Sequence, residues 1–322
     1  MSSATGSTYS GMFENNVKQG YGILLHPLGK YSGHFMNDAK EGEGTLIFND
    51  ASSYNGGFKE NQFHGKGTLC TKDNTVYVGD WFSGLKNGQG CETYADGRIY
   101  RGGFQDGQRS GDGAFHKKSG GDVVYSGSWL NGIFHGEGTC LYQQMQGNMD
   151  PSEPSENHKE LRYHGSFFNG LRHGYGVLMN GTDGLVLKGQ WHKNLPIDGK
   201  WRIEYQDGSI YSGGAKVKED IFPESRDKDQ LIPMDSSKSE APLVMDTCTF
   251  EISMPSPHGF GALRYSNSDV YIGNFQNGTR MGLGSLFTSG GVRLEGTWKN
   301  DSLVLDSTVS KLTEYSDIHS GS

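Results

Sequence analysis

Basic residues recur in the chain at a spacing that could serve an anionic ligand. Six of them stand two positions before a Gly-x-Gly tripeptide, namely Lys18, Lys40, Lys86, Arg109, Arg172 and Arg280. Aligned on one surface, they could meet phosphoinositide head groups, where each cation is worth about 1 kcal/mol. They are the candidates for an anionic-lipid site. Acidic residues such as Glu41 and Asp106 occupy the same segments, and the formal net charge is −8, so solvated turn charges are the competing interpretation.

Histidines and glycines offer a second set of chemical possibilities. A histidine directly precedes the Gly-x-Gly at four places, namely His64, His135, His173 and His258. Equivalent residues of successive copies stand about 10 Å apart, too far to share a metal whose ligands lie about 2 Å away. A phosphate-binding glycine loop needs a helix after it, and here the tripeptide recurs without one. The sequence therefore predicts no catalytic residue, no metal site, no cofactor and no enzymatic activity.

Aromatic residues form a third candidate set, in the recurring phrase Tyr-x-Gly-x-Phe/Trp. Residues i, i+2 and i+4 of a strand share one face, so the rings should align as ladders with a channel over the intervening glycine. The partner-groove candidates are Tyr54, Phe58, Tyr77, Trp81, Tyr100, Phe104, Tyr125, Trp129, Tyr163 and Phe167.

Two interpretations of these ladders stay open. They are the core of a one-layer sheet, held by cross-strand pairs worth about 0.2–1 kcal/mol each. Alternatively, because one sheet cannot cover both of its faces, part of the ladder receives a partner's helix or extended segment.

A period of about 23 residues positions all of these side chains. The phrase opens at Tyr9, Tyr31, Tyr54, Tyr77, Tyr100, Tyr125, Tyr163 and Tyr271. In every copy the Gly-x-Gly begins eleven residues after the tyrosine. A fixed period of this length predicts a linear repeat array, and the alternation within each copy predicts a two-stranded hairpin. The 50 glycines fall mainly at fixed places in the copies, which indicates a geometric role.

The strength of the repeat varies along the chain and suggests a division into segments. The predicted segments are residues 1–142 with repeats 1–6, a polar insertion loop at 143–162, residues 163–215 with repeats 7–9, a charged Ser/Pro linker at 216–247, C-terminal repeats at 248–305, and a polar tail at 306–322. Repeats 8 and 9 are degenerate, the copy expected to start near Cys248 is degenerate as well, and the last copy is truncated. The two insertions are candidates for partner contacts or plain spacers.

Composition limits the compartment and the class of partner. The acidic balance argues against general nucleic-acid binding, which usually goes with a strongly basic surface. No CxxC pair occurs among the cysteines, which is typical of a reduced cytosolic protein; they are Cys70, Cys91, Cys140 and Cys248. The first residues lack the regions of a signal peptide, and no apolar run approaches the ~20 residues of a spanning helix. We expect a cytoplasmic protein.

The repeat resembles that of the MORN family (membrane occupation and recognition nexus). The family unit is about 23 residues of the type YxGxWxxGxxxGxGxxxxxxG, and the match covers roughly residues 9–215 and 248–298. The resemblance implies an all-β fold, an elongated single-layer twisted antiparallel sheet of about 10–12 hairpin repeats. It also implies an aromatic-lined groove for partners. Because no second domain is evident, the chain resembles a stand-alone member.

The resemblance carries expectations about function. MORN repeats occur beside lipid-kinase, methyltransferase and exchange-factor domains, in junctional membrane proteins, and in free-standing cytoskeletal and ciliary proteins. We therefore expect a non-catalytic scaffold or adaptor that binds other proteins in a cytoskeletal, ciliary or flagellar (axonemal) setting. The alternatives are a peripheral membrane adaptor that recognises anionic phospholipids and a regulatory subunit of a separately encoded enzyme. A homodimer through the C-terminal end is a further expectation, because the weak last repeats end in a sheet edge.

Overall fold

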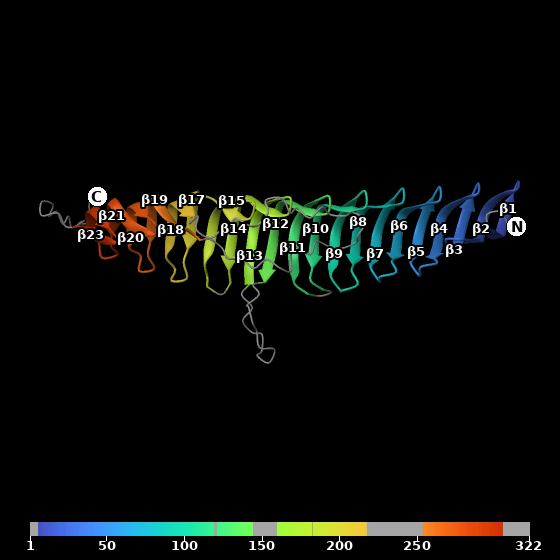
Figure 1. The fold of residues 1–322 in the computed structure, drawn as a ribbon, viewed down its shortest axis with the longest axis horizontal. Coiled ribbons are helices and arrows are strands. Elements are labelled where there is room, and N and C mark those ends of the chain that lie inside the picture. Colours follow the sequence, from blue (N-terminus) through green and yellow to red (C-terminus); the bar gives the residue numbers. More distant parts are fainter. Residues whose placement is uncertain (1–5, 119–120, 144–159, 182, 218–253, 305–322) are drawn as a thin grey trace, which may run out of the picture. The chain divides into compact units, whose positions relative to one another are not determined.

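The structure is a computed structural model, and it describes residues 6–118, 121–143, 160–181, 183–217 and 254–304 (Figure 1). These residues form 23 β-strands and no helix, which confirms the all-β prediction. The chain divides into two compact units, Met1–Cys140 and Leu141–Ser322. Within each unit, the strands form an open, single-layer antiparallel sheet of successive hairpins.

The first unit holds strands β1 to β11 and most of β12, which pair in chain order. Their bounds are β1 Thr8–Glu14, β2 Val17–His26, β3 Gly29–Met36, β4 Ala39–Phe48, β5 Ser53–Lys59, β6 Gln62–Cys70, β7 Val76–Phe82, β8 Leu85–Thr93, β9 Ile99–Gln105, β10 Gln108–His116, β11 Val123–Leu130 and β12 Ile133–Gln143.

The second unit holds strands β13 to β23, in which the short β16 pairs only with β15 and β15 also pairs with β17. Their bounds are β13 Glu160–Phe168, β14 Leu171–Asn180, β15 Val186–His192, β16 Leu195–Pro196, β17 Gly199–Glu204, β18 Ile210–Val217, β19 Pro255–Arg264, β20 Val270–Gln276, β21 Thr279–Phe287, β22 Arg293–Lys299 and β23 Ser302–Val304.

Residues with positive φ shape each hairpin. Glu60 and Asn61 join β5 to β6 with φ angles of 48° and 70°, the geometry of a two-residue type I′ turn. Gly57 of β5 then lies opposite residues 64–66 of β6, because the register shifts between the glycine and phenylalanine pairs. Gly65 absorbs this bulge with a φ of +70°. The first glycine of the Gly-x-Gly is therefore a bulge residue.

The second glycine of the Gly-x-Gly lies beneath the tyrosine ring. A Cβ added at Gly67 would lie 2.3 Å from Tyr54 Oη, so only glycine leaves room for the phenol. The Tyr54 hydroxyl donates a hydrogen bond to the carbonyl oxygen of Gly57 at 2.9 Å. The equivalent bond forms at Tyr9, Tyr31, Tyr77, Tyr100, Tyr125, Tyr163, Tyr211 and Tyr271. The channel expected over the glycines is therefore filled by the tyrosine itself.

Alkaline pH should unfold the sheets by ionising these phenols. Burial raises the pKa of Tyr54 and of Tyr211 to about 12, above the ordinary value of 10.0. Because the folded pKa is raised, the stabilisation is fully present below the ordinary pKa and is lost as the pH rises through the folded one. We expect tyrosinate absorbance to appear together with loss of the β-sheet circular dichroism between about pH 10 and 12. Phenols that ionise while the sheet stays intact would contradict this.

A tryptophan compensates for the missing tyrosine of one degenerate repeat. Leu187 stands at the tyrosine position, and the indole of Trp201, from β17, covers Gly189 instead. A Cβ added at Gly189 would lie 2.3 Å from that indole. Trp201 Nε1 donates a hydrogen bond to the carbonyl oxygen of Ile197 at 2.8 Å, so the polar N–H group of the buried indole has a hydrogen-bond partner. The repeat keeps its core although its sequence signature is lost.

The repeat that opens at Tyr211 is completed by β19. β18 pairs with β19, and Gly261 lies beneath the Tyr211 ring. A Cβ added at Gly261 would lie 2.5 Å from Tyr211 Oη. This Gly-x-Gly therefore belongs to the Tyr211 repeat, and not to the separate copy that the sequence period predicts near Cys248. Residues 218–253, which contain that expected start and most of the predicted linker, lie outside the described residues, as do 144–159 and 305–322.

Candidate binding surfaces

Alternation along the strands gives each sheet two chemically different faces. In β5, Tyr54, Gly56 and Phe58 are buried on one face, while Asn55 and Lys59 are exposed on the other. We call the side that carries the repeated tyrosine, second glycine and Phe/Trp the aromatic face. The side that carries the residues between them is the reverse face.

The ten partner-groove candidates form the core of the aromatic face. None of their side chains is more than 5 % exposed: Tyr54, Phe58, Tyr77, Trp81, Tyr100, Phe104, Tyr125, Trp129, Tyr163 and Phe167. Trp81 packs edge-on against Tyr77 of its own repeat and Tyr54 of the preceding one, with ring centroids 5.2 and 5.3 Å apart. Phe58, Phe104 and Trp129 make the same two contacts. Direct partner contact by these rings stays a prediction, and their burial does not favour it.

The six anionic-lipid candidates also lie on the aromatic face, each over a tyrosine ring. Lys86 Nζ lies 5.0 Å from the ring centroid of Tyr77. The guanidinium of Arg172 lies 4.5 Å from the Trp191 ring and 5.7 Å from Tyr163. The remaining contacts are Lys18 over Tyr9, Lys40 over Tyr31, Arg109 over Tyr100 and Arg280 over Tyr271. These are cation–π contacts, and Arg109 and Arg172 are only 7 % and 1 % exposed.

Neighbouring groups within the protein engage much of the charge of this basic row. Lys18 and Arg280 pair with the carboxylates that follow one repeat later, Asp38 at 3.5 Å and Asp301 at 3.2 Å. Lys86 pairs with buried Glu92, which also accepts a hydrogen bond from the hydroxyl of Tyr94 at 2.5 Å. Arg172 Nη2 donates to the carbonyl oxygen of Asn194 at 2.8 Å, and burial lowers the pKa of Lys40. A lipid role for the six residues stays a prediction that this placement does not favour.

The sequence held a signal for this placement. Two repeats carry phenylalanine at the position two before the Gly-x-Gly, namely Phe63 and Phe134. Phe63 stacks on Tyr54 with centroids 3.7 Å apart, and Phe134 stacks on Tyr125 at 3.8 Å. A position that holds either a cation or a phenyl ring is suited to a tyrosine face and not to a lipid head group. Lys and Arg fit because their aliphatic stems pack on apolar surface.

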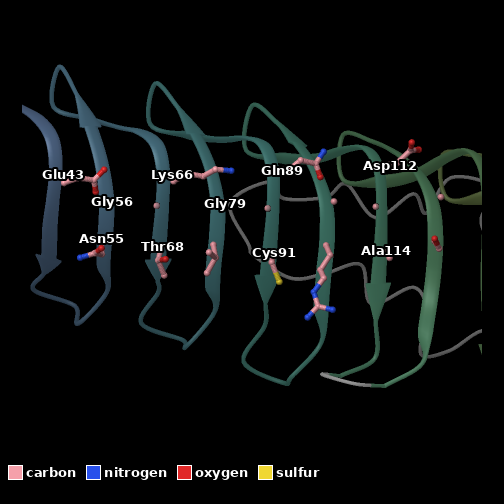
Figure 2. A pocket seen from close by; sticks show the side chains of 18 residues that line it. Glu43, Asn55, Gly56, Lys66, Thr68, Gly79, Gln89, Cys91, Asp112 and Ala114 are labelled. Carbon is pink, nitrogen blue, oxygen red and sulfur yellow. The ribbon is translucent and has the colours of Figure 1, made fainter.

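An open groove crosses the reverse face of the first unit, from β4 to β11. Its volume is about 1030 Å³, and backbone of glycine pairs such as Gly79 and Gly90 lines its floor. Figure 2 shows Glu43, Lys66, Gln89 and Asp112 along one side and Asn55, Thr68, Cys91 and Ala114 along the other. Val78, Arg101 and Ser126 also line it. Eight strands at about 4.8 Å spacing give it a length of about 34 Å.

The groove offers charged, polar and apolar side chains together. Lys66 and Asp80 form an ion pair at 2.5 Å, and the hydrogen bond from Lys66 lowers the pKa of Asp80. Arg101 faces Cys91 and Ala114 on the neighbouring strands, and within the described residues it forms no ion pair. Its guanidinium is thus available to a carboxylate. Such a groove can receive an extended polypeptide, through hydrogen bonds to its polar sides and contacts with the half-exposed Val78.

The groove could not be predicted from the sequence, because its side chains vary from repeat to repeat. They occupy the positions between the recurring residues of the repeat and form no motif of their own. Only the alternation itself, which places every such residue on the face opposite the tyrosine, could have indicated them.

The histidines before the Gly-x-Gly do not gather into a site. His64 packs on the Phe82 ring and His173 on the Phe168 ring, with centroids 5.3 and 5.7 Å apart. Across the described ranges, no three His, Cys, Asp or Glu side chains are placed to hold a metal ion. Those ranges also contain no helix of the length and hydrophobicity that crossing a membrane requires.

Comparison with known families identifies the hairpin. The model of the MORN repeat matches residues 9–27, 31–53, 54–76, 77–97, 125–144, 163–182 and 271–292. The chain is a MORN-repeat protein. MORN repeats are non-enzymatic binding modules, generally for proteins or membranes. The MORN hairpin extends beyond the matched segments, because Tyr100 and Tyr211 each cover a glycine pair and make the same hydrogen bond.

Other comparisons add little to this family assignment. No curated protein matches the chain. Among solved structures, it is similar to the SAS-4 (dCPAP) TCP domain of Drosophila melanogaster in complex with a proline-rich motif of Ana2 (dSTIL), at 9 % identity and a TM-score of 0.25 over 73 % of this chain and 85 % of that one. It is also similar to the TCP10 domain of Danio rerio CPAP in complex with a STIL peptide, at 10 % identity and a TM-score of 0.25 over 93 % and 98 %. Similarities this low do not bear on the function of the MORN chain.

Proposed function

We propose that this MORN protein is a non-catalytic scaffold that binds an extended segment of another protein in the reverse-face groove of its first unit. The observation that carries the proposal is the groove itself, since the opposite face is filled by its own aromatic core. An extended chain rises about 3.3 Å per residue, so the groove accommodates about ten residues. The free guanidinium of Arg101, on β9, favours a segment with a carboxylate in the part that lies toward β11.

The proposed setting is the cytoskeleton, with the cilium or flagellum first among its compartments. Its support is the family resemblance, because free-standing MORN proteins occur there. The six candidate cations for lipid binding are engaged with rings and carboxylates, so we do not propose a membrane adaptor. A homodimer through the C-terminal end, where β23 is the last described strand, is proposed on sequence grounds and is tested by sedimentation equilibrium of the full chain.

Reversing the charge of Arg101 should weaken partner binding by about tenfold or more, since an arginine that becomes buried when the partner binds often contributes this much. The measurement is affinity capture of partners by the full chain with quantitative mass spectrometry. Lys59→Glu is the matched control, because it makes the same charge change at an exposed strand position that does not line the groove.

Arg101→Glu should lose a defined set of partners that Lys59→Glu retains. Both variants should have the same melting temperature as the wild-type chain, because both side chains are exposed. The proposal fails if the two variants keep, or lose, the same partners.

A further inference from the structure

Four exposed apolar side chains gather on the reverse face of the second unit. Phe260 and Leu283 are 67 % and 70 % exposed, and Ile272 and Phe287 are 41 % and 38 % exposed. They come from three adjacent strands, β19, β20 and β21, which pair in that order. We call these four residues the apolar patch. Ile272 stands opposite Ala262 and Ser285, so it lies diagonally across from each of the other three. Single exposed apolar residues are ordinary, but a group of large ones marks an interaction site.

The same repeat position is polar or charged in most other repeats, and Tyr21 and Tyr175 occupy it in two. Phe260 and Leu283 are the middle residues of their Gly-x-Gly tripeptides. In five of the first six repeats, that position holds a polar or charged residue: Glu43, Lys66, Gln89, Asp112 and Glu137. The hairpin therefore does not require an apolar side chain there. Phe260 and Leu283 also contribute little to the core of their own sheet, so burial against another molecule would account for apolar side chains there.

The charges around the apolar patch are mainly positive. Arg264 stands opposite Val270 on the neighbouring strand and is exposed, and Lys200 is exposed two strands away on the same face. In the part of the chain that the structure describes, neither forms an ion pair. Arg293 stacks on a patch ring at 5.4 Å and pairs with Glu295 at 2.7 Å. A cationic border around an apolar surface complements a partner that is apolar and acidic.

The dimensions of the patch favour a helix as the occupant. Phe260 and Leu283 are two strand spacings apart, about 10 Å, which is close to the rise of two helical turns. Leu283 and Phe287 are four residues apart on one strand, about 13 Å. A surface this wide in both directions matches the apolar face of a helix better than it matches a single row of an extended chain.

We propose that the apolar patch is a docking site for an acidic amphipathic helix of another protein, whose carboxylates lie against Arg264 and Lys200. The site is distinct in position and chemistry from the groove of the first unit. A scaffold with both sites can hold two different segments at once, an extended one and a helical one.

The test uses the full chain and a fluorescein-labelled peptide of leucine and glutamate, about 18 residues or five helical turns, patterned as an amphipathic helix. Fluorescence anisotropy should show saturable binding. The same peptide with every glutamate replaced by lysine should bind about tenfold more weakly or worse. Leu283→Glu and Arg264→Glu should each weaken binding of the acidic peptide by about tenfold.

Tyr175→Glu is the matched control. Tyr175 is also the exposed middle residue of a Gly-x-Gly in the second unit, but it lies on β14 and outside the patch. The affinity of this variant for the acidic peptide should be within about twofold of the wild-type affinity. All variants should have the wild-type melting temperature, because the altered side chains are exposed.

Several outcomes would overturn the proposal. They are absence of binding, equal binding of the acidic and basic peptides, or an equal loss with Tyr175→Glu. Binding of phosphatidylserine vesicles that Leu283→Glu abolishes, without peptide binding, would assign the patch to a membrane. Concentration-dependent self-association that Leu283→Glu abolishes, again without peptide binding, would assign it to a second copy of the chain.

Discussion

Replacing Gly67 by alanine should destabilise the first unit by about 3 kcal/mol or more, as overpacking against a rigid neighbour does. The new methyl group would lie 2.3 Å from Tyr54 Oη and 2.5 Å from the ring carbon that bears it. The ring must then lift from the sheet. It would lose its hydrogen bond to Gly57 and disturb its contacts with Phe63 and Trp81. Urea denaturation followed by circular dichroism measures the change.

Gly65 is the matched control, because it belongs to the same tripeptide. Its φ is +70°, but a Cβ there would meet nothing within 4 Å. Gly65→Ala should therefore cost only the strain of the left-handed backbone, about 1–2 kcal/mol. If the two alanine variants lose equal stability, the tyrosine does not rest on the second glycine as described.

Removing the side chain of Arg172 should destabilise the second unit by about 2–4 kcal/mol. Its guanidinium is 1 % exposed, lies 4.5 Å from the Trp191 ring and donates to the carbonyl oxygen of Asn194. Arg172→Ala loses these contacts together, and it leaves a cavity between Trp191 and Tyr163. Denaturant midpoints of wild type and variant give the difference.

Lys18→Ala is the comparison for Arg172→Ala. Lys18 occupies the same repeat position, but its side chain is 27 % exposed and its ion pair with Asp38 spans 3.5 Å. We expect a loss below about 1 kcal/mol, typical of a surface pair. If Arg172→Ala is as mild as Lys18→Ala, the basic row is a surface feature after all. In that case, its candidacy for anionic lipid would gain support.

The hairpin and its period could be predicted from the sequence, because each residue that recurs from repeat to repeat has one steric role. Tyrosine needs a glycine beneath it, the bulge needs a glycine with positive φ, and each Phe or Trp needs the tyrosine one repeat before it. These contacts join residues within one repeat or in successive repeats, so the residues that make them recur in the sequence with the period of the repeat. Trp201 shows the limit of such reasoning, because it covers Gly189 from a position that no other repeat uses.

Long-range pairing was harder to predict from the sequence. The Gly-x-Gly at Gly259 pairs with the Tyr211 strand across residues 218–253, and the interrupted period hid this relation. The basic row was assigned to solvent or lipid because Lys and Arg are charged, whereas their stems and cations pack on tyrosine faces. The groove on the reverse face left no signal in residue type, since its side chains are free to vary.

We expect this MORN protein to bind its partner on the reverse face of the first unit, while the aromatic face serves as core. A photo-crosslinking residue, p-benzoylphenylalanine, placed at Val78 or at Phe48 in the full chain tests this in the protein's own cell. Val78 is 51 % exposed in the groove, and Phe48 is a half-buried residue of the aromatic face. We predict partner crosslinks from Val78 and none from Phe48. Crosslinks from Phe48 with none from Val78 would contradict binding on the reverse face.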